Sequence, residues 1–464
     1  MTAFLDQLKD IVGPKGWTID PSEMQPHLED WRGAYTGRAA IVVKPASTRE
    51  VIDLVSLCAA ANVAIVPQGG NTSLCGAATP DSSGDQVLMS LSRMNRVRGV
   101  DAENFSMEVE AGCILASAQD AARAAGRFLP LSLGAEGTCQ VGGNIATNAG
   151  GLNVGRYGTA RSLVLGLEVV LADGTVLDGM RALRKDTAGY DLKQLFIGSE
   201  GTLGIITAAV LRLFPDPGET STALVGLGSA SSAVTLLAGL KGRLSDRIES
   251  FELMPRRIFD LVEKHIPDAG LPFAIDHPWY VLIESATNDA AEMLEEALLA
   301  EAENNAILDA VVAKNASEAN ALWRVRHSIA EAEKKEGRAL KHDISVPLSS
   351  MEEFLARGDE LLARLRPDHE LVAFGHVGDG NLHYNVVLPR GLTDDEWRTE
   401  GLRITGALYK LVDELGGSFS AEHGVGQAKK AWLAEYRGGS ELALMKTIKK
   451  TLDPANILNP GKVF

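Results

Sequence analysis

Glycine clusters in the first half of the chain restrict its fold more than any other sequence feature. The 464-residue sequence contains 47 glycines, concentrated at residues 69–76, 134–158 and 198–204. Glycine loses more conformational entropy on folding than other residues do, so its repeated use in an ordered core indicates backbone that turns sharply or approaches a ligand closely. Three such clusters favour a ligand-binding role over ordinary turns between strands.

The first cluster follows a short apolar strand and has the sequence Pro67-Gln68-Gly69-Gly70-Asn71-Thr72-Ser73. Its consecutive backbone N–H groups and hydroxyls can point toward one anion, such as a pyrophosphate. The two common nucleotide fingerprints are absent from the sequence. It has no GxxxxGKS/T loop, and no GxGxxG that follows a strand, opens a helix and precedes a suitably placed acidic residue.

Residues 1–218 show an α/β pattern, in which short β-branched runs alternate with amphipathic segments. Ser47 or Thr48 is expected to cap a helix, and a strand at 64–67 is expected to follow it. The sequence Pro215-Asp-Pro-Gly218 predicts the boundary of this first domain.

Residues 219–418 are expected to form a second domain of α+β type with an antiparallel sheet, because long polar helical segments separate strands such as PWYVLIES. Residues 419–464 are expected to form a C-terminal helical segment that completes the active site. The predicted fold class is therefore α+β overall, with an α/β domain first.

The second domain contains a hairpin with two histidines, in the sequence AFGHVGDGNLHYNVVL at 373–388. If Asp379-Gly380 forms a two-residue type I′ turn, His376 lies directly across from His383. Opposed residues have Cβ atoms about 4.5–5.5 Å apart, which suits two imidazoles that share a metal ion. Asn385 is expected on the same face as His383.

A third ligand can come from the sequence Ala421-Glu422-His423-Gly424. Neighbours on an extended strand point to opposite faces, so one division makes Glu422 the ligand and His423 the general base. Two histidines and one carboxylate leave positions open for substrate, as in catalytic sites. The predicted metal is Zn²⁺, with Mn²⁺ or Fe²⁺ as alternatives.

The motifs PQGGNTS, GGNIATNAGG and GSEGTLGI together resemble the FAD-binding domain of the vanillyl-alcohol oxidase and p-cresol methylhydroxylase (PCMH) flavoprotein superfamily. This resemblance implies a two-part FAD-binding domain of PCMH type. It implies that the loop at 67–73 holds the pyrophosphate, that the second motif lines the flavin, and that the third meets the adenine or ribose. The further residues it implies for the cofactor are Gly134, Gly137, Thr138, Gly142, Gly143, Ala146, Thr147, Asn148, Gly150, Gly151, Glu200, Gly201, Ile205 and Asn459.

Some members of this superfamily attach the flavin covalently through His or Cys. Asn71 stands at the position of the usual histidine and cannot form that bond, whereas Cys139 is expected to be a buried structural cysteine. The resemblance therefore predicts non-covalent FAD.

The motifs GHVGDGNLHYN and AEHGVG resemble the D-2-hydroxyacid dehydrogenase branch of the superfamily, which includes D-lactate and D-2-hydroxyglutarate dehydrogenases. By this resemblance, the metal binds the 2-hydroxyl and one carboxylate oxygen, His423 removes the hydroxyl proton, and hydride passes from C2 to flavin N5. His376, His383, Glu422 and Asn385 would then contact the substrate as well.

Arg326 and Lys341 match cations that bind substrate carboxylates in the D-2-hydroxyglutarate dehydrogenases of this branch. A second cation suits a second carboxylate, so the expected substrate is D-2-hydroxyglutarate, with D-malate also possible. Ala330 departs from the family, because related enzymes often have a hydroxyl residue there. The alternatives are a dehydrogenase of D-lactate or glycolate type, a non-redox flavin transferase, and a non-catalytic flavin-binding subunit.

The net charge of −16 argues against nucleic acid or an anionic membrane as main partner. No run of about 18 apolar residues predicts a membrane span, and the polar start MTAFLDQLKD leads us to expect a cytoplasmic location. The four cysteines lack haem or iron–sulfur spacing, so electrons are expected to leave the flavin for another protein or a quinone. The resemblance points to electron-transfer flavoprotein, and a homodimer is possible.

Overall fold

The computed structural model describes residues 2–271, 274–286, 289–304 and 307–464. The chain forms two compact units. Unit 1 contains Met1–Gly151, Tyr157–Asp216 and Glu422–Phe464, and unit 2 contains Leu152–Arg156 and Pro217–Ala421. The C-terminal segment, predicted as residues 419–464, packs with unit 1 from Glu422 onwards.

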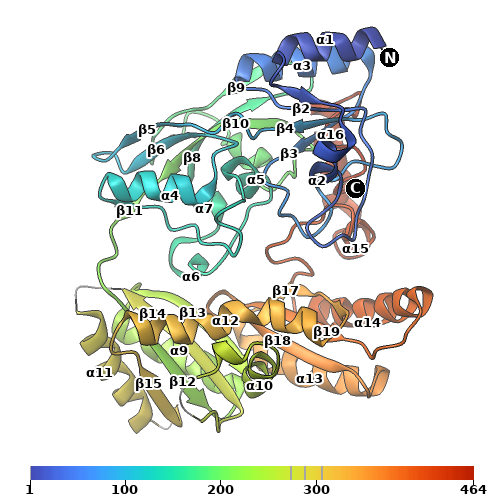
Figure 1. Ribbon diagram of the computed structural model, residues 1–464. Helices are drawn as coiled ribbons and strands as arrows, with labels where there is room; N and C mark the ends of the chain where they lie inside the picture. The colour runs from blue at the N-terminus through green and yellow to red at the C-terminus, as the bar shows by residue number, and fades with distance from the viewer. Residues whose placement is uncertain (1, 272–273, 287–288, 305–306) are drawn as a thin grey trace. The chain divides into compact units, whose positions relative to one another are not determined.

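Unit 1 has two main sheets (Figure 1). The first has the order β1-β2-β4-β3, in which β2, β4 and β3 are parallel and β1 is antiparallel. Its strands are β1 (Trp17–Thr18), β2 (Ile41–Val43), β3 (Ile65–Gln68) and β4 (Val87–Ser90). The second is antiparallel, with the order β5-β6-β10-β8-β9. Its strands are β5 (Val97–Asp101), β6 (Ser106–Glu110), β8 (Val164–Val170), β9 (Val176–Asp178) and β10 (Ile205–Arg212).

A small pair of strands, β7 (Arg127–Phe128) and β11 (Phe214–Pro215), completes the sheets described in unit 1. Its helices are α1 (Thr2–Val12), α2 (Pro21–Leu28), α3 (Thr48–Ala61), α4 (Leu115–Ala124), α5 (Val141–Ala146), α7 (Ala160–Leu163), α8 (Lys193–Phe196), α15 (Lys430–Tyr436) and α16 (Gly439–Leu452). Helix α6 (Val154–Tyr157) lies at the boundary between the units.

Helix α3 begins where the sequence predicts. The Ser47 hydroxyl accepts a hydrogen bond from the Glu50 N–H at 3.3 Å, and so satisfies one of the free donors of the first turn. Val51, Leu54 and Val55 are fully buried on one face. This face joins a core that both main sheets of unit 1 share, so α3 fixes strand β3 and the loop that follows it.

The C-terminal segment lies beside β3, although some 390 residues separate the two in sequence (Figure 1). The Ile65 N–H donates to the Ile457 carbonyl at 2.7 Å, and the Asn459 N–H donates to the Ile65 carbonyl at 2.8 Å. The buried ammonium group of Lys449 donates to the Leu458 carbonyl. These hydrogen bonds hold the C-terminal residues beside strand β3 of the first sheet.

Unit 2 is built on one mainly antiparallel sheet with the order β15-β12-β14-β13-β18-β19-β16, and β17 also pairs with β19. Its strands are β12 (Thr220–Leu227), β13 (Ile248–Pro255), β14 (Trp279–Ala286), β15 (Asp309–Val312), β16 (Ala339–Leu340), β17 (Asp343–Ser345), β18 (Glu370–His376) and β19 (Asn381–Val387). The antiparallel sheet agrees with the prediction for this region.

Helices cover the sheet of unit 2. They are α9 (Ala230–Leu244), α10 (Arg256–His265), α11 (Ala290–Glu303), α12 (Ala316–Glu336), α13 (Met351–Leu365) and α14 (Asp394–Glu414), with 3-10 turns η1 (Pro267–Ala269), η2 (Leu348–Ser350) and η3 (Val377–Asp379). Helices α10 and α12 share a buried core with one face of the sheet (Figure 1). Among the described residues, no helix is long and apolar enough to cross a bilayer.

Candidate functional site

The glycine-rich loops of unit 1 enclose a cavity of about 290 Å³. Its walls come from the loop after β3, the segment that leads into α5, the start of β10, and the first residues of the C-terminal segment. The lining residues that the sequence predicted are Pro67, Gln68, Gly69, Gly70, Asn71, Thr72, Ser73, Gly134, Gly142, Gly143, Ala146, Thr147, Gly150, Glu200, Gly201, Ile205, Glu422 and His423.

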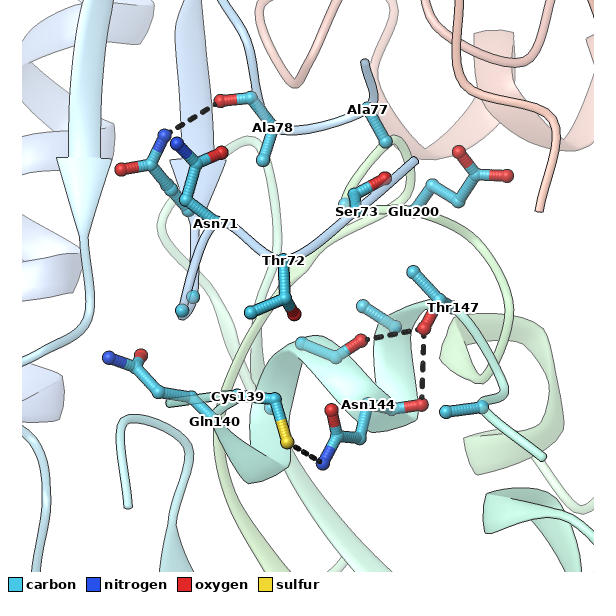
Figure 2. Close-up of a pocket in the computed structure, with 18 of the residues that line it drawn as sticks. Asn71, Thr72, Ser73, Ala77, Ala78, Cys139, Gln140, Asn144, Thr147 and Glu200 are labelled. Atoms are coloured by element: carbon cyan, nitrogen blue, oxygen red, sulfur yellow. Dashed lines mark hydrogen bonds between the residues drawn. The ribbon is translucent and has the colours of Figure 1, made fainter. Parts of the chain in front are cut away.

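The loop after β3 offers a row of backbone donors to this cavity. In the part of the chain that the structure describes, the N–H groups of residues 70–73 donate to no protein acceptor. Buried or partly buried amides normally have partners, so a row without them is suited to an anionic ligand. Figure 2 shows the Thr72 side chain projecting toward Cys139 and Asn144. The loop therefore fits the pyrophosphate of a dinucleotide.

Asn71 holds this loop to the C-terminal end of helix α2 instead of facing the cavity with its side chain. Its amide nitrogen donates to the Pro26 carbonyl at 3.0 Å and to the Glu29 carbonyl at 2.8 Å. The residue has φ of 54°, a left-handed conformation that Asn tolerates better than most side chains. In Figure 2 its side chain points away from Thr72 and α5.

Two glycines in these loops are required because the loops pack on one another. A Cβ atom on Gly70 would lie 2.2 Å from the Thr138 carbonyl oxygen, and one on Gly201 would lie 2.5 Å from the Pro67 ring. Gly201 also has φ of 71°. The glycine clusters therefore serve close packing between loops as well as close approach to a ligand.

Glu200 ties the C-terminal segment to the cavity. Its buried carboxylate accepts the Val425 N–H at 2.6 Å and the Gly426 N–H at 2.7 Å. Burial raises the pKa of Glu200, and the two N–H bonds oppose that rise. The Glu422 carboxylate accepts the Gly151 N–H at 2.9 Å. Glu422 and His423 are thereby brought to the wall of the cavity that the glycine loops form.

Five residues predicted to contact the cofactor do not line the cavity: Gly137, Thr138, Asn148, Gly151 and Asn459. Polar members of this set stabilise the loops instead. The Asn148 side-chain oxygen accepts from the Arg161 N–H at 2.9 Å, and the Asn459 side chain donates to the Glu200 carbonyl at 2.7 Å. Motif membership alone did not separate residues that face the cavity from residues that support its walls.

Cys139 lies in the cavity wall and is buried, as predicted. The Asn144 side chain donates to its sulfur at 3.5 Å (Figure 2). Burial raises the pKa of the Cys139 thiol, which keeps it in the weakly nucleophilic protonated form. The other three cysteines are buried too, as the sequence analysis expected.

In unit 2 the histidine hairpin exists, but its predicted register was wrong by two residues. His383 faces Phe374 across the strand pair, because the turn is longer than the predicted Asp379-Gly380 loop and includes a 3-10 turn at Val377–Asp379. A shift of two keeps the same face of a strand, so His376 and His383 still share one face. Their ring centroids are 5.6 Å apart.

Glu252 on β13 orients His376. The two residues are paired in register, and the His376 Nδ1 atom makes a short hydrogen bond with the Glu252 carboxylate. A histidine whose Nδ1 is held by a carboxylate presents Nε2 to a metal, a common arrangement around metal sites. The other Glu252 oxygen accepts from the Arg326 Nε atom at 2.6 Å.

Glu252 is fully buried. Burial alone would raise the pKa of the Glu252 carboxyl group, but the charges and hydrogen bonds of Arg326 and His376 outweigh burial and hold the pKa well below its usual range. The ionised form of this carboxylate is therefore favoured by its two cationic partners. Arg326, predicted as a substrate cation, also lies over the Phe374 ring.

Lys341 and Asn385, both predicted to contact substrate, meet at a buried carboxylate. The Lys341 ammonium group donates to Glu333 Oε2 at 2.5 Å, and the Asn385 amide donates to the same oxygen at 3.1 Å. Sequence reasoning missed Glu252 and Glu333. Glu333 stands seven residues after Arg326 on α12, a spacing that places both on one helix face and that the sequence already contained.

Two family models match successive parts of the chain. The family model described as FAD binding domain matches residues 39–179, and the model described as FAD linked oxidases, C-terminal domain, matches residues 216–463. The chain is 39% identical to D-2-hydroxyglutarate dehydrogenase, mitochondrial, of Bos taurus, over 98% of this chain and 82% of the relative. It is 38% identical to D-2-hydroxyglutarate dehydrogenase of Xanthomonas citri pv. viticola, over 96% and 93% respectively.

Solved structures share the fold at low sequence identity. p-Cresol methylhydroxylase with substrate bound superposes with a TM-score of 0.79 at 16% identity, over the whole of this chain and 96% of the other. An alkyldihydroxyacetonephosphate synthase gives a TM-score of 0.74 at 17% identity, over 99% of this chain and 84% of the other. At these identities the likeness supports the fold alone.

Proposed function

This chain belongs to the family of FAD-linked oxidases, and from that membership we propose that it is a dehydrogenase that oxidises D-2-hydroxyglutarate to its 2-oxoacid. D-Malate, which also carries a second carboxylate, is a further candidate substrate. The observation that carries the proposal is that Glu422 and His423 line the same cavity as the glycine-rich cofactor loops.

The residues of the cavity fit FAD, and their expected roles follow from their chemistry. Residues 70–73 would donate N–H groups to the pyrophosphate, and the small residues near α5 leave room for the flat ring system. Bound FAD would accept the hydride from C2 of the substrate. His423 would take the proton of the 2-hydroxyl group, since an imidazole is a suitable base near neutral pH.

We propose that His376, His383 and Glu422 hold one divalent metal, with Zn²⁺ as first choice and Mn²⁺ or Fe²⁺ as alternatives. Within unit 2, the Ala421 N–H donates to the Asp343 carbonyl, and Asp343 pairs in register with His383. Glu422 directly follows Ala421 in the chain, and this adjacency supports Glu422 as the third metal ligand. A metal there would lower the pKa of the substrate hydroxyl.

Arg326 and Lys341 would bind the substrate carboxylates in this proposal. One observation favours a second candidate, a dehydrogenase of D-lactate or glycolate type: both cations already have buried carboxylate partners, Glu252 and Glu333. A second cation therefore argues less strongly for a second carboxylate than it did from sequence alone. The low-identity likeness to the alkyldihydroxyacetonephosphate synthase carries no comparable support for a flavin transferase.

We also propose that the electron acceptor is another protein, such as electron-transfer flavoprotein, or a quinone. All four cysteines are buried and stand apart in the sequence, which gives no ligand set for an iron–sulfur cluster. Copurification with an acceptor and the molar mass in solution would test the acceptor and a homodimer.

Anaerobic addition of D-2-hydroxyglutarate to the holoenzyme should bleach the flavin absorbance near ~450 nm, because hydride transfer produces reduced flavin. Stopped-flow traces with D-malate, D-lactate, glycolate and L-2-hydroxyglutarate provide the comparison. Faster reduction by a monocarboxylate would favour the second candidate. No reduction by any of these acids would contradict the proposed function.

The purified protein should be yellow and should release FAD when acid or heat denatures it. Asn71 has an amide that cannot bond to the flavin, and the Cys139 thiol is buried and protonated. Absorbance of the supernatant and of the precipitate after acid treatment measures the distribution. Flavin that stays with the denatured polypeptide would contradict the role given to Asn71.

A further inference from the structure

Glu333 lies inside unit 2 on the face of helix α12 that carries Arg326 and Ala330. These residues are spaced i, i+4 and i+7, so they form one stripe along the helix. The Glu333 residue is 1% exposed. Its Oε2 atom accepts from Lys341 at 2.5 Å and from Asn385 at 3.1 Å. The carboxylate therefore contacts two residues that the sequence predicts to contact the substrate.

The second carboxylate oxygen of Glu333 has no recorded partner. Its Oε1 atom is buried and makes no hydrogen bond within the described part of the chain. Buried polar atoms are nearly always paired, so such an atom in a folded protein calls for a functional or a structural reason. An acceptor in this position repels an anion and attracts a donor.

The two cations proposed to bind substrate each form an ion pair with a buried carboxylate. Arg326 is matched by Glu252 at 2.6 Å, and Lys341 is matched by Glu333 at 2.5 Å. Glu252 also makes a hydrogen bond with His376, so its role is not limited to pairing with Arg326. Within the described part of the chain, Glu333 bonds Lys341 and Asn385 but neither His376 nor His383. Its main electrostatic effect falls on Lys341.

We propose that Glu333 is a specificity-determining residue that competes with a distal substrate carboxylate for Lys341. It weakens the preference of the site for dicarboxylates and so admits D-2-hydroxyacids whose distal end is uncharged. This inference rests on the proposed function for the identity of the substrate. The competition itself concerns only carboxylate binding beside Lys341 and can be measured without turnover.

A purely structural Glu333 would behave differently. If it only holds Lys341 and Asn385 in place, its replacement weakens every carboxylate ligand to the same extent. If it competes, its replacement strengthens dicarboxylates selectively, because Lys341 is released to the distal group and a negative charge is removed from its side. The ratio of two affinities therefore separates the two roles.

The test uses the FAD-loaded protein and isothermal titration with glutarate and pentanoate, acids of the same chain length that differ in the second carboxylate. Glu333→Gln should tighten glutarate binding by roughly 10- to 100-fold and leave pentanoate within about threefold. Glu336→Gln is the matched control. It removes a carboxylate from the same helix, one that pairs with Lys264 and His265 instead. It should change neither affinity.

A double variant shows whether the effect passes through Lys341. In a Lys341→Gln background, Glu333→Gln should no longer improve glutarate binding. Thermal unfolding checks that each variant is folded, and Glu333→Leu, which also removes the charge, replaces Glu333→Gln if the latter does not fold. The proposal is overturned by equal changes for both acids, by a gain that persists without Lys341, or by undetectable glutarate binding to the charge-removed variant.

Turnover separates this inference from the proposed function. If flavin is reduced, Glu333→Gln should shift the ratio of kcat/KM for D-2-hydroxyglutarate over D-lactate upward by the same factor as the binding ratio. If no hydroxyacid reduces the flavin, the proposed function fails, whereas the titrations with glutarate and pentanoate still decide the role of Glu333.

Discussion

His423→Ala should lower the rate of flavin reduction by roughly 10²- to 10⁴-fold, the usual contribution of a positioned general base. His423 lines the cofactor cavity of unit 1, in the segment that Glu200 fixes through the Val425 and Gly426 N–H groups. The substitution removes the base without removing these backbone bonds. Single-turnover stopped-flow measurements under anaerobic conditions give the rate directly.

Affinity and cofactor content distinguish loss of the base from loss of the site. FAD occupancy and the substrate concentration at half-maximal rate should change little in His423→Ala, because the residue acts mainly on the proton. His369→Ala is a useful control, since that imidazole bonds the Arg366 carbonyl at a turn outside the cavity. An unchanged reduction rate in His423→Ala would move the base to another residue.

His376→Ala should abolish flavin reduction and leave FAD bound. The cofactor loops belong to unit 1, whereas His376 belongs to unit 2, where the Glu252 carboxylate orients it and His383 lies beside it. Loss of one of the three proposed protein ligands is expected to remove the proposed metal or greatly weaken its binding. Metal analysis, the flavin spectrum and stopped-flow reduction on the same preparation provide the three readouts.

Chelation gives the same test without a mutation. Removal of the metal from the wild-type holoenzyme should stop reduction, and re-addition of Zn²⁺ or Mn²⁺ should restore it, while the flavin spectrum remains that of the bound cofactor. FAD lost in step with the metal would contradict the assignment of cofactor and metal to separate groups of residues. Full activity in His376→Ala would remove the histidine from the proposed metal site.

The family and the fold class could be predicted from sequence, and both predictions are confirmed. The reason is physical: glycines at fixed places in three loops are needed both for close packing, as at Gly70, and for amides that face a ligand. Local signals were also reliable, as the Ser47 cap of α3 demonstrates. The cap depends only on residues that are near one another in the chain.

The errors arose at an irregular turn and where distant segments meet. The histidine hairpin was given a two-residue turn, but Gly375 and Gly380 have positive φ and a 3-10 turn lies between them, so the register moved by two residues. Glu252 and Glu333 could not be identified as partners of His376 and Lys341, because β13 and α12 reach them only through tertiary packing. The positions of the proposed substrate and metal residues remain predictions for the experiments above.

Unit 1 is assembled from segments that are far apart in the chain, and this affects the order in which it can fold during synthesis. A ribosome releases β3 and the first glycine-rich loop long before the segment that contributes Val425, Gly426 and Asn459. The part of the cavity wall that Glu422 and His423 form is therefore missing until that segment has been made. Contacts across such a long sequence separation form slowly, so we expect the flavin to bind only after that segment has packed against the glycine-rich loops.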